Sequence, residues 1–146
     1  MSVSKTLDRK VWFPHVWFFL NTVAYAYPDT PTQVTKRKYY DFIQNIPLFL
    51  PNEEIGNRFS HLLDAFPVTP YLANKDSFTY WVHFIHNKMN RFLGEEEKTY
   101  FDHMDEYYSH YAPTEYVLST RLNIQKKYLV LAFIFICLLF CCYCYI

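Results

Sequence analysis

The chain has 146 residues, and its 14 lysines and arginines balance 14 aspartates and glutamates, so the formal charge is zero. A neutral chain of this length favours one compact domain and argues against a protein that binds nucleic acid through a basic surface. Only two glycines are present, which nearly excludes the glycine-rich loops that cradle phosphates. Aromatic residues make up 21% of the chain, so we expect a core built on large rings.

The first part of the chain predicts two helices. We expect residues 1–10, which are polar, to be flexible. An apolar, aromatic helix is predicted over residues 12–26, with Pro14 in its first turn. After the turn at residues 28–32, Thr30 can cap a second helix, with Pro31 at its first position. Pro47 should kink or end this second helix, because proline removes a backbone donor.

Three further helices follow. Asn52 is a suitable N-cap for a third helix that runs to about residue 66. A fourth helix should start at Asn74 or Asp76 and end at Gly94 in the left-handed conformation. The acidic run at residues 95–97 is predicted to open a short fifth helix, which ends before Pro113. The predicted fold class is therefore all-α: a four-helix bundle with a short fifth helix over residues 11–112.

Residues 128–146 form a stretch of 19 residues without a charge. As a helix it would be roughly 28 Å long, close to the hydrocarbon thickness of a bilayer. We therefore expect a C-terminal transmembrane helix, a tail anchor, joined to the bundle by a linker over residues 113–127. Lys126 and Lys127 precede the stretch and no charge follows it, which predicts a single-pass membrane protein with its N-terminal domain on the cytosolic side.

All four cysteines lie in this last stretch, at positions 137, 141, 142 and 144. Residues 1–136 contain none, so this part of the chain can form no disulfide and offers no thiol nucleophile. We favour the interpretation that these cysteines are small apolar residues suited to lipid. The alternatives are acylation and a redox pair of Cys141 with Cys144.

Thr79, His83, His86 and Asn90 recur at helical spacing and share one flank of the fourth predicted helix. The favoured interpretation is a solvated polar flank. One alternative is a metal site completed by His103, Asp102 or Asp105, and another is a cofactor site in which the flank binds a planar ring. We predict no metal site, because zinc needs three or four ligands and helix five would have to fold back to supply them. We also predict no catalytic residues, because the glutamates at 53–54 and 95–97 are explained by the dipoles of the helices that they open.

Several short motifs follow one another in order along the chain. They are Trp17-x-x-Leu20-Asn21-Thr22, Tyr27-Pro28-Asp29-Thr30-Pro31-Thr32, Asp41-Phe42-Ile43, Pro51-Asn52-Glu53-Glu54-Ile55, Phe78-Thr79-Tyr80-Trp81, His86-Asn87-x-x-Asn90-x-x-Leu93-Gly94 and Asp105-Glu106-Tyr107-Tyr108. Together they resemble the Erv/ALR family of FAD-linked sulfhydryl oxidases from about residue 17 to residue 111. The string that begins at His86 is the most specific of them. The resemblance implies a four-helix bundle with a short fifth helix, in agreement with the helices predicted above.

The resemblance also implies a cofactor site for FAD, whose residues here are Trp17, His86, Asn87, Asn90 and Tyr108. This chain differs from the family's pattern at the residues that carry out the family's redox reaction. The redox centre of the family is a Pro-Cys-x-x-Cys motif, and its two cysteine positions read Asn52 and Ile55 in this chain. An amide and a branched alkane cannot form a disulfide or pass electrons to a flavin. The family's pattern also differs at three further positions, which here are Asn21, His83 and Glu95.

We therefore expect a catalytically inactive bundle with a structural or interaction role. Because the family is common in large DNA viruses, whose particles carry a membrane under a capsid shell, the analogy suggests a minor capsid or inner-membrane protein of such a virus. Its expected partners are capsid or membrane proteins and a second copy of the chain. The alternative function is an FAD-dependent thiol oxidase that forms disulfides with oxygen as acceptor, using Cys141 and Cys144 or a partner's thiols.

Overall fold

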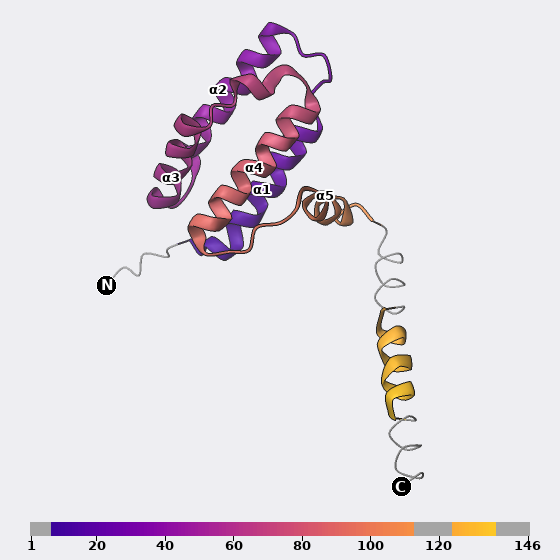
Figure 1. Ribbon diagram of the computed structural model, residues 1–146. Helices are drawn as coiled ribbons and strands as arrows, with labels where there is room; N and C mark the ends of the chain where they lie inside the picture. Colours follow the sequence, from indigo (N-terminus) through magenta and orange to yellow (C-terminus); the bar gives the residue numbers. More distant parts are fainter. Residues whose placement is uncertain (1–6, 113–123, 137–146) are drawn as a thin grey trace, which may run out of the picture. The chain divides into compact units, whose positions relative to one another are not determined.

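The computed structural model describes residues 7–112 and 124–136 (Figure 1). These residues contain helices and no strand, which confirms the all-helical prediction. The chain divides into two compact units, Met1–Met104 and Asp105–Ile146. Its elements are α1 (Arg9–Tyr25), α2 (Gln33–Phe49), α3 (Glu53–Ala65), the 3-10 helix η1 (Thr69–Ala73), α4 (Lys75–Leu93) and α5 (Tyr100–Ser109), and residues 124–136 are also helical.

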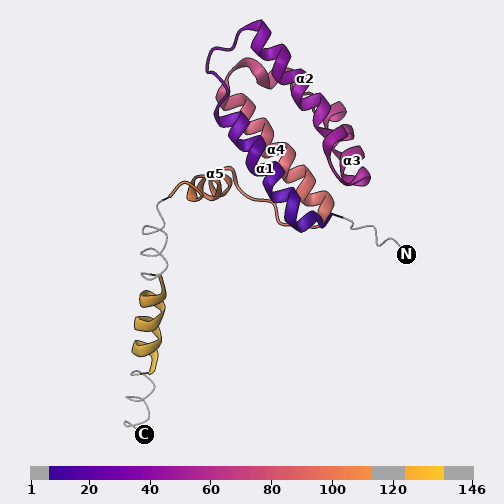
Figure 2. The ribbon, with the colours of Figure 1, turned by 180° about the vertical axis from the view of Figure 1, so that it is seen from behind.

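The first unit is built from two pairs of helices. Helix α1 lies along α4, and α2 lies along α3, as both views of the ribbon show (Figures 1 and 2). Helix η1 contacts both α2 and α4 and so joins the two pairs. The core between them is aromatic, as the composition predicts, and its largest fully buried side chains include Trp81, Tyr27, Phe59 and Phe78.

The polar atoms of two core rings bind main-chain carbonyls. The Tyr27 hydroxyl donates to the carbonyl oxygen of Leu72 at 3.0 Å, and Nε1 of Trp81 donates to that of Phe66, also at 3.0 Å. These bonds let the rings enter the core without leaving a buried donor unsatisfied. They also fix the segment between α3 and α4 against the bundle.

Helices α3 and α4 begin and end at the capping residues that the sequence predicts. Asn52 caps α3 by accepting a hydrogen bond from the backbone nitrogen of Ile55 at 3.0 Å, and Asn74 caps α4 by accepting from that of Ser77 at 2.9 Å. Gly94 ends α4 with φ of 71°, in the left-handed region that glycine adopts without steric cost. The predicted bounds of these two helices are confirmed.

The first two helices differ from the prediction. Helix α1 begins at Arg9 with Asp8 as its cap, so Pro14 lies inside the helix and not in its first turn. Helix α2 is capped by Thr32, two residues after the expected cap at Thr30. Pro47 does not end α2, which continues to Phe49, because a proline so near the C-terminus leaves the remaining hydrogen bonds of the helix in place.

The prediction for the start of the fifth helix is wrong. Residues 95–99 are not helical, and α5 begins only at Tyr100. Side chains of α4 bind the peptide groups of residues 96 and 98 and hold this segment outside a helix. A favourable interaction of glutamates with a helix dipole is worth only a few tenths to about 1 kcal/mol, so tertiary hydrogen bonds readily override it.

The described part of the C-terminal region contains an exposed helix over residues 124–136. Among the described residues, none of the helices combines the length and apolar character needed to cross a bilayer. The predicted anchor, residues 128–146, extends beyond them, because residues 137–146 with all four cysteines lie outside the described residues. The same holds for residues 113–123 of the predicted linker and for residues 1–6.

Gly56 marks the closest approach of α3 to α2. A Cβ atom at this position would lie 2.8 Å from the carbonyl oxygen of Pro47, inside van der Waals contact. We expect Gly56→Ala to lower the free energy of unfolding by about 1 kcal/mol or more, because two packed helices must separate to admit the methyl group. Chemical denaturation of the full-length chain measures this. Asn57→Ala is the matched control at an exposed site of the same helix, and an equal loss there would contradict the steric explanation.

Candidate functional site

The polar flank of α4 is buried and not solvated. His83 is 8% exposed and Asn90 4%, so the favoured interpretation of a solvated flank is wrong. It is covered by α1 on one side and by the segment from residue 95 to His103 on the other. We use the name histidine cluster for His83, His86 and His103 together with Trp17 and Asn21.

Trp17 of α1 and His86 of α4 stack on each other. Their ring centroids are 4.2 Å apart and the ring planes differ by 12°. Trp17 is 3% exposed, and its ring also meets Phe13 and Phe59, at centroid distances of 5.8 and 6.0 Å. The stack therefore joins α1 and α4 and connects the histidine cluster to the aromatic core.

His103 closes the other side of the cluster. Its ring centroid is 5.2 Å from those of both His83 and His86, in edge-to-face arrangements. Its Nε2 lies 2.9 Å from Oδ1 of Asn21, and since an amide oxygen only accepts, the imidazole donates. Asn21 and His103 are both buried, and they link α1 to the first turn of α5.

Two asparagines of α4 bind the segment that precedes α5. Asn87 makes a two-point pairing with the peptide groups of Lys98: its Nδ2 donates to the carbonyl at 2.8 Å and its Oδ1 accepts from the nitrogen at 3.1 Å. Asn90 donates to the carbonyl of Glu96 at 3.3 Å. These contacts explain why residues 95–99 leave the helical path.

Three buried nitrogens of the cluster have no hydrogen-bond partner within the described part of the chain: Nε1 of Trp17 and the Nδ1 atoms of His83 and His86. Nε2 of His83 lies 3.0 Å from the carbonyl of Lys98, to which it can donate, and 3.2 Å from Nδ2 of Asn87, from which it can accept. Unsatisfied polar atoms in a buried site are uncommon, so these three nitrogens are candidates for contact with a ligand or water.

The cluster lowers the pKa of His86 to about 3. Burial is the main cause, and the nearby His103, Lys98 and His83 add electrostatic repulsion of a charged imidazole. Stacking on Trp17 would favour a cation through the face of the indole, but such an interaction is worth only about 2 kcal/mol when desolvated and is outweighed here. His86 is thus a neutral imidazole at physiological pH.

The metal alternative has no support in the cluster's geometry. Within residues 7–112 and 124–136, no group of three or more histidine, cysteine, aspartate or glutamate side chains is arranged to hold a metal ion. Nε2 of His103 donates to Oδ1 of Asn21, so this atom offers no lone pair to a metal.

The start of α3 is occupied by the two residues that the resemblance aligns with the family's redox cysteines. Asn52 accepts the hydrogen bond that begins the helix, and Ile55 is 3% exposed within the hydrophobic core. Each position therefore stabilises the fold, one as a cap and one by apolar packing. Neither side chain can exchange electrons.

Four of the five residues predicted to bind a cofactor come together in the first unit: Trp17, His86, Asn87 and Asn90. Tyr108 belongs to the second unit, where its half-exposed ring packs against Tyr107 at a centroid distance of 5.2 Å. The pairing of Asn21 with His103 was not predicted, and no local pattern signals it, since the two residues are 82 positions apart.

The fold defines a class of protein: a helical bundle like that of Erv1. The crystal structure of the yeast Erv1 core is similar with a TM-score of 0.64 and 19% identity, covering 73% of this chain and 89% of that one. The crystal structure of a cysteine-to-serine double mutant of Erv1 from Saccharomyces cerevisiae is similar with a TM-score of 0.63, 20% identity, and coverage of 73% and 94%. At this level of identity the structures establish the fold alone.

The chain belongs to the Erv1/Alr family, whose family model matches residues 14–111. It is 30% identical over 95 residues to a probable FAD-linked sulfhydryl oxidase of Acanthamoeba polyphaga mimivirus, covering 64% of this chain and 66% of the relative. It is 32% identical over 79 residues to the FAD-linked sulfhydryl oxidase ERV1 of Oryza sativa subsp. japonica, covering 54% and 40%. The chain thus spans less than two thirds of the length of these relatives.

Proposed function

We propose that this protein is a membrane-anchored member of the Erv1/Alr family that does not oxidise thiols by the family's usual route and serves a structural or interaction role. The start of α3 carries the proposal. There Asn52 caps the helix and Ile55 fills the core, at the positions where the resemblance places a redox disulfide. Residues 1–136 contain no cysteine that could replace it.

The chemical argument is one of electron balance. Oxidising two thiols to a disulfide removes two electrons and two protons, and a thiolate must attack a sulfur atom on the way. The first unit offers no sulfur except that of its methionines, and a thioether cannot undergo this exchange. What the bundle retains is its packed aromatic core and its buried cluster, which are features of a stable scaffold.

The anchor and the partners extend the proposal. Residues 128–146 would place the bundle on the cytosolic side of a membrane, with Lys126 and Lys127 at the interface. The similarity to a mimivirus protein supports a viral setting, in which a minor capsid or virion inner-membrane protein would contact capsid or membrane proteins and a second copy of itself. A structural role of this kind needs no redox sulfur, so the bundle can perform it.

One observation favours a second candidate, an FAD-dependent thiol oxidase. The three unpartnered nitrogens of the cluster fit a bound planar group with a polar edge, although Asn87 and Asn90 already bind main-chain groups. Trp17, His86, Asn87 and Asn90 would hold FAD, which would accept electrons from thiols and deliver them to oxygen. The thiols would then have to come from Cys141 and Cys144 or from another protein.

Spectroscopy of the purified full-length chain in neutral detergent separates these candidates. We expect no flavin absorbance in the blue region and no hydrogen peroxide when dithiothreitol is added. The matched variant replaces the cysteines at 137, 141, 142 and 144 by serine. A yellow protein that produces peroxide would overturn the proposal, and loss of that activity in the serine variant would assign it to the C-terminal cysteines.

The anchor has its own test. Membranes from cells that express the full-length chain are washed with alkaline carbonate, and the protein should stay in the pellet. Ile136→Lys should release a large fraction, because a lysine near the middle of a membrane helix costs about 3 kcal/mol of insertion free energy. Ile136→Leu is the control, and release of the unaltered chain would refute the anchor without affecting the proposal on thiol chemistry.

A further inference from the structure

The segment that follows α4 is held over the histidine cluster without a covalent cross-link. We use the name strap for residues 95–103, which lie in the first unit. Nε2 of His103 donates to Oδ1 of Asn21 at 2.9 Å, and the carbonyl of Lys98 accepts from Nδ2 of Asn87 at 2.8 Å. No cysteine occurs in this unit, so no disulfide can reinforce these hydrogen bonds. The strap therefore stays in place only while its noncovalent contacts hold.

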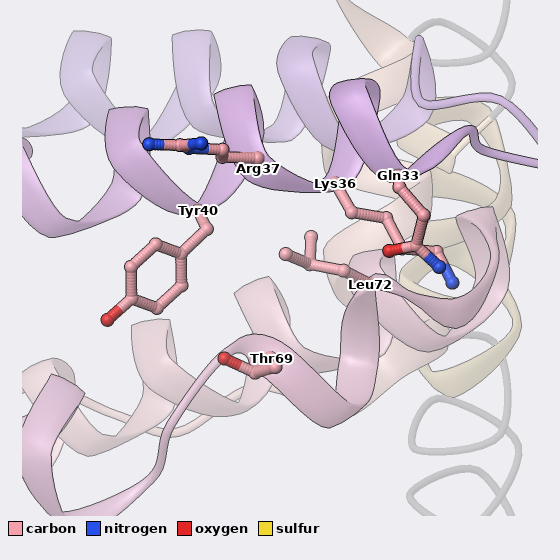
Figure 3. A pocket seen from close by; sticks show the side chains of 6 residues that line it. All are labelled: Gln33, Lys36, Arg37, Tyr40, Thr69 and Leu72. Atoms are coloured by element: carbon pink, nitrogen blue, oxygen red, sulfur yellow. The ribbon is translucent and has the colours of Figure 1, made fainter.

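Three imidazoles meet beneath the strap. The ring centroid of His103 lies 5.2 Å from those of His83 and His86, and His83 and His103 are both buried. By contrast, the side chains of Lys36 and Arg37, which line a cavity beside η1, extend away from each other (Figure 3). The cluster therefore brings together groups that become like charges when they are protonated, and like charges repel strongly where water is excluded.

The acidic side chains of the strap are engaged outside the cluster. Glu95 and Glu97 pair with arginines of α1 and α4. Asp102 accepts a hydrogen bond from the hydroxyl of Thr99, and Glu96 is exposed to solvent. These carboxylates therefore stabilise the surface of the strap and not a charged imidazole beneath it.

The charges that act on the cluster disfavour a proton there. Burial lowers the pKa of His86 to about 3, and His103, Lys98 and His83 add electrostatic repulsion. Tyr100, whose ring centroid lies 5.4 Å from that of His83, is neutral in mildly acidic solution, as are the side chains that α1 contributes to the cluster. Burial and the neighbouring cations therefore oppose protonation while the strap is closed.

We propose that the strap is an acid-sensitive clamp, which is closed over the histidine cluster at neutral pH and detaches locally in mildly acidic solution. Opening exposes the imidazoles to water, where they bind protons that the closed cluster disfavours. The free energy of opening therefore falls as the pH drops below about 6.5, the ordinary pKa of histidine. Detachment breaks the hydrogen bonds of Asn87 and Asn90 to the strap and opens the cluster to solvent.

The inference does not depend on the proposed function. The contacts that carry it join α1, α4 and the strap, and none of them involves Asn52, Ile55 or the C-terminal cysteines. Its failure would leave the proposal on thiol chemistry untouched, and a thiol oxidase activity would leave the clamp untouched.

The first test is hydrogen exchange with mass spectrometry on the full-length chain in neutral detergent, at pH 7 and pH 5. Protection is expressed relative to the intrinsic exchange rate at each pH. The backbone nitrogens of Lys98 and His103 report on the closed strap, because they donate to Oδ1 of Asn87 and to the carbonyl of Thr99. We expect protection of the strap to fall several-fold at pH 5, and by up to about 25-fold if His86 regains its ordinary pKa on opening.

The amides of α2 separate a local opening from unfolding of the whole bundle. At both pH values we expect the strap to be less protected than α2. Low concentrations of urea should speed exchange in α2 and leave the strap nearly unchanged, since a local opening exposes little surface. Two results would overturn the inference: equal protection of the strap at pH 7 and pH 5, or equal protection of the strap and α2 at each pH.

Variants then locate the titrating group. His86→Phe keeps a flat ring in the cluster and does not titrate, so the fall in protection should shrink. Asn21→Asp places a carboxylate where Nε2 of His103 donates, which stabilises a charged imidazole in the closed cluster and should also shrink the fall. His61→Gln is the matched control, because it removes an exposed histidine of α3 and should leave the fall unchanged.

An unchanged fall in either cluster variant, or an equal reduction in His61→Gln, would show that the cluster does not control the strap. If the buried carboxylate of Asn21→Asp prevents folding, His86→Phe decides the question alone.

Discussion

Replacing Trp17 by alanine should lower the free energy of unfolding by about 3–5 kcal/mol, the range measured for large aromatic residues in protein cores. Trp17 is 3% exposed and contacts rings of α1, α3 and α4. Its removal leaves a cavity at the point where the two helix pairs meet. The unpartnered Nε1 atom offsets part of this loss, since alanine also removes a buried donor that has no acceptor among the described residues.

Urea denaturation of the full-length chain, followed by circular dichroism, measures this effect. The matched control is Phe19→Ala, which removes an aromatic ring from the same helix at a position that is 55% exposed. It should cost less than about 1 kcal/mol. If both variants lose the same free energy, Trp17 does not hold the position in the core that the structure gives it.

The free energy of unfolding should fall in acid because of His86. Its pKa is about 3 in the folded chain and 6.5 in the unfolded one. Between these two values the unfolded chain binds a proton that the folded chain does not, so stability is complete above pH 6.5 and is lost as the pH falls toward 3. The expected loss relative to neutral pH is about 2 kcal/mol at pH 5 and about 3 kcal/mol at pH 4.

His86→Phe isolates this contribution, because phenylalanine keeps a flat ring against Trp17 and does not titrate. Denaturation at pH 7, 5 and 4 should show a smaller loss in this variant than in the unaltered chain, by the amounts just given. His15→Gln is the control, since it removes an exposed histidine of α1 and leaves the cluster intact. An unchanged pH dependence in His86→Phe would show that folding does not lower the pKa of His86.

Helical spacing predicted that His86 and Asn90 share a flank of α4. The resemblance to the Erv/ALR family added Trp17 and Asn87 to the same site, and the structure brings these four residues together. The assignment of a cofactor to them stays a prediction. The burial of the flank was missed, because a helical pattern shows which residues share a face and not what covers that face.

The start of the fifth helix was also mispredicted, because tertiary hydrogen bonds override the local pattern there. Three glutamates at residues 95–97 have the composition of a helix start, yet the segment is not helical. Its path is set by Asn87 and Asn90, which bind the peptide groups of Lys98 and Glu96. Such bonds depend on how the chain folds back after Gly94, and nothing in the local sequence encodes that direction.

By itself, the sequence determined the helical class, the caps of α3 and α4, the family and the lack of sulfur for disulfide exchange in the first 136 residues. These features follow from residue identity and from neighbours within a few positions. Only the tertiary structure decided that the histidines are buried, that His103 binds Asn21 and that Lys36 and Arg37 border a cavity. Those facts come from contacts between residues far apart in the chain, which form because burying the aromatic core brings the helices together.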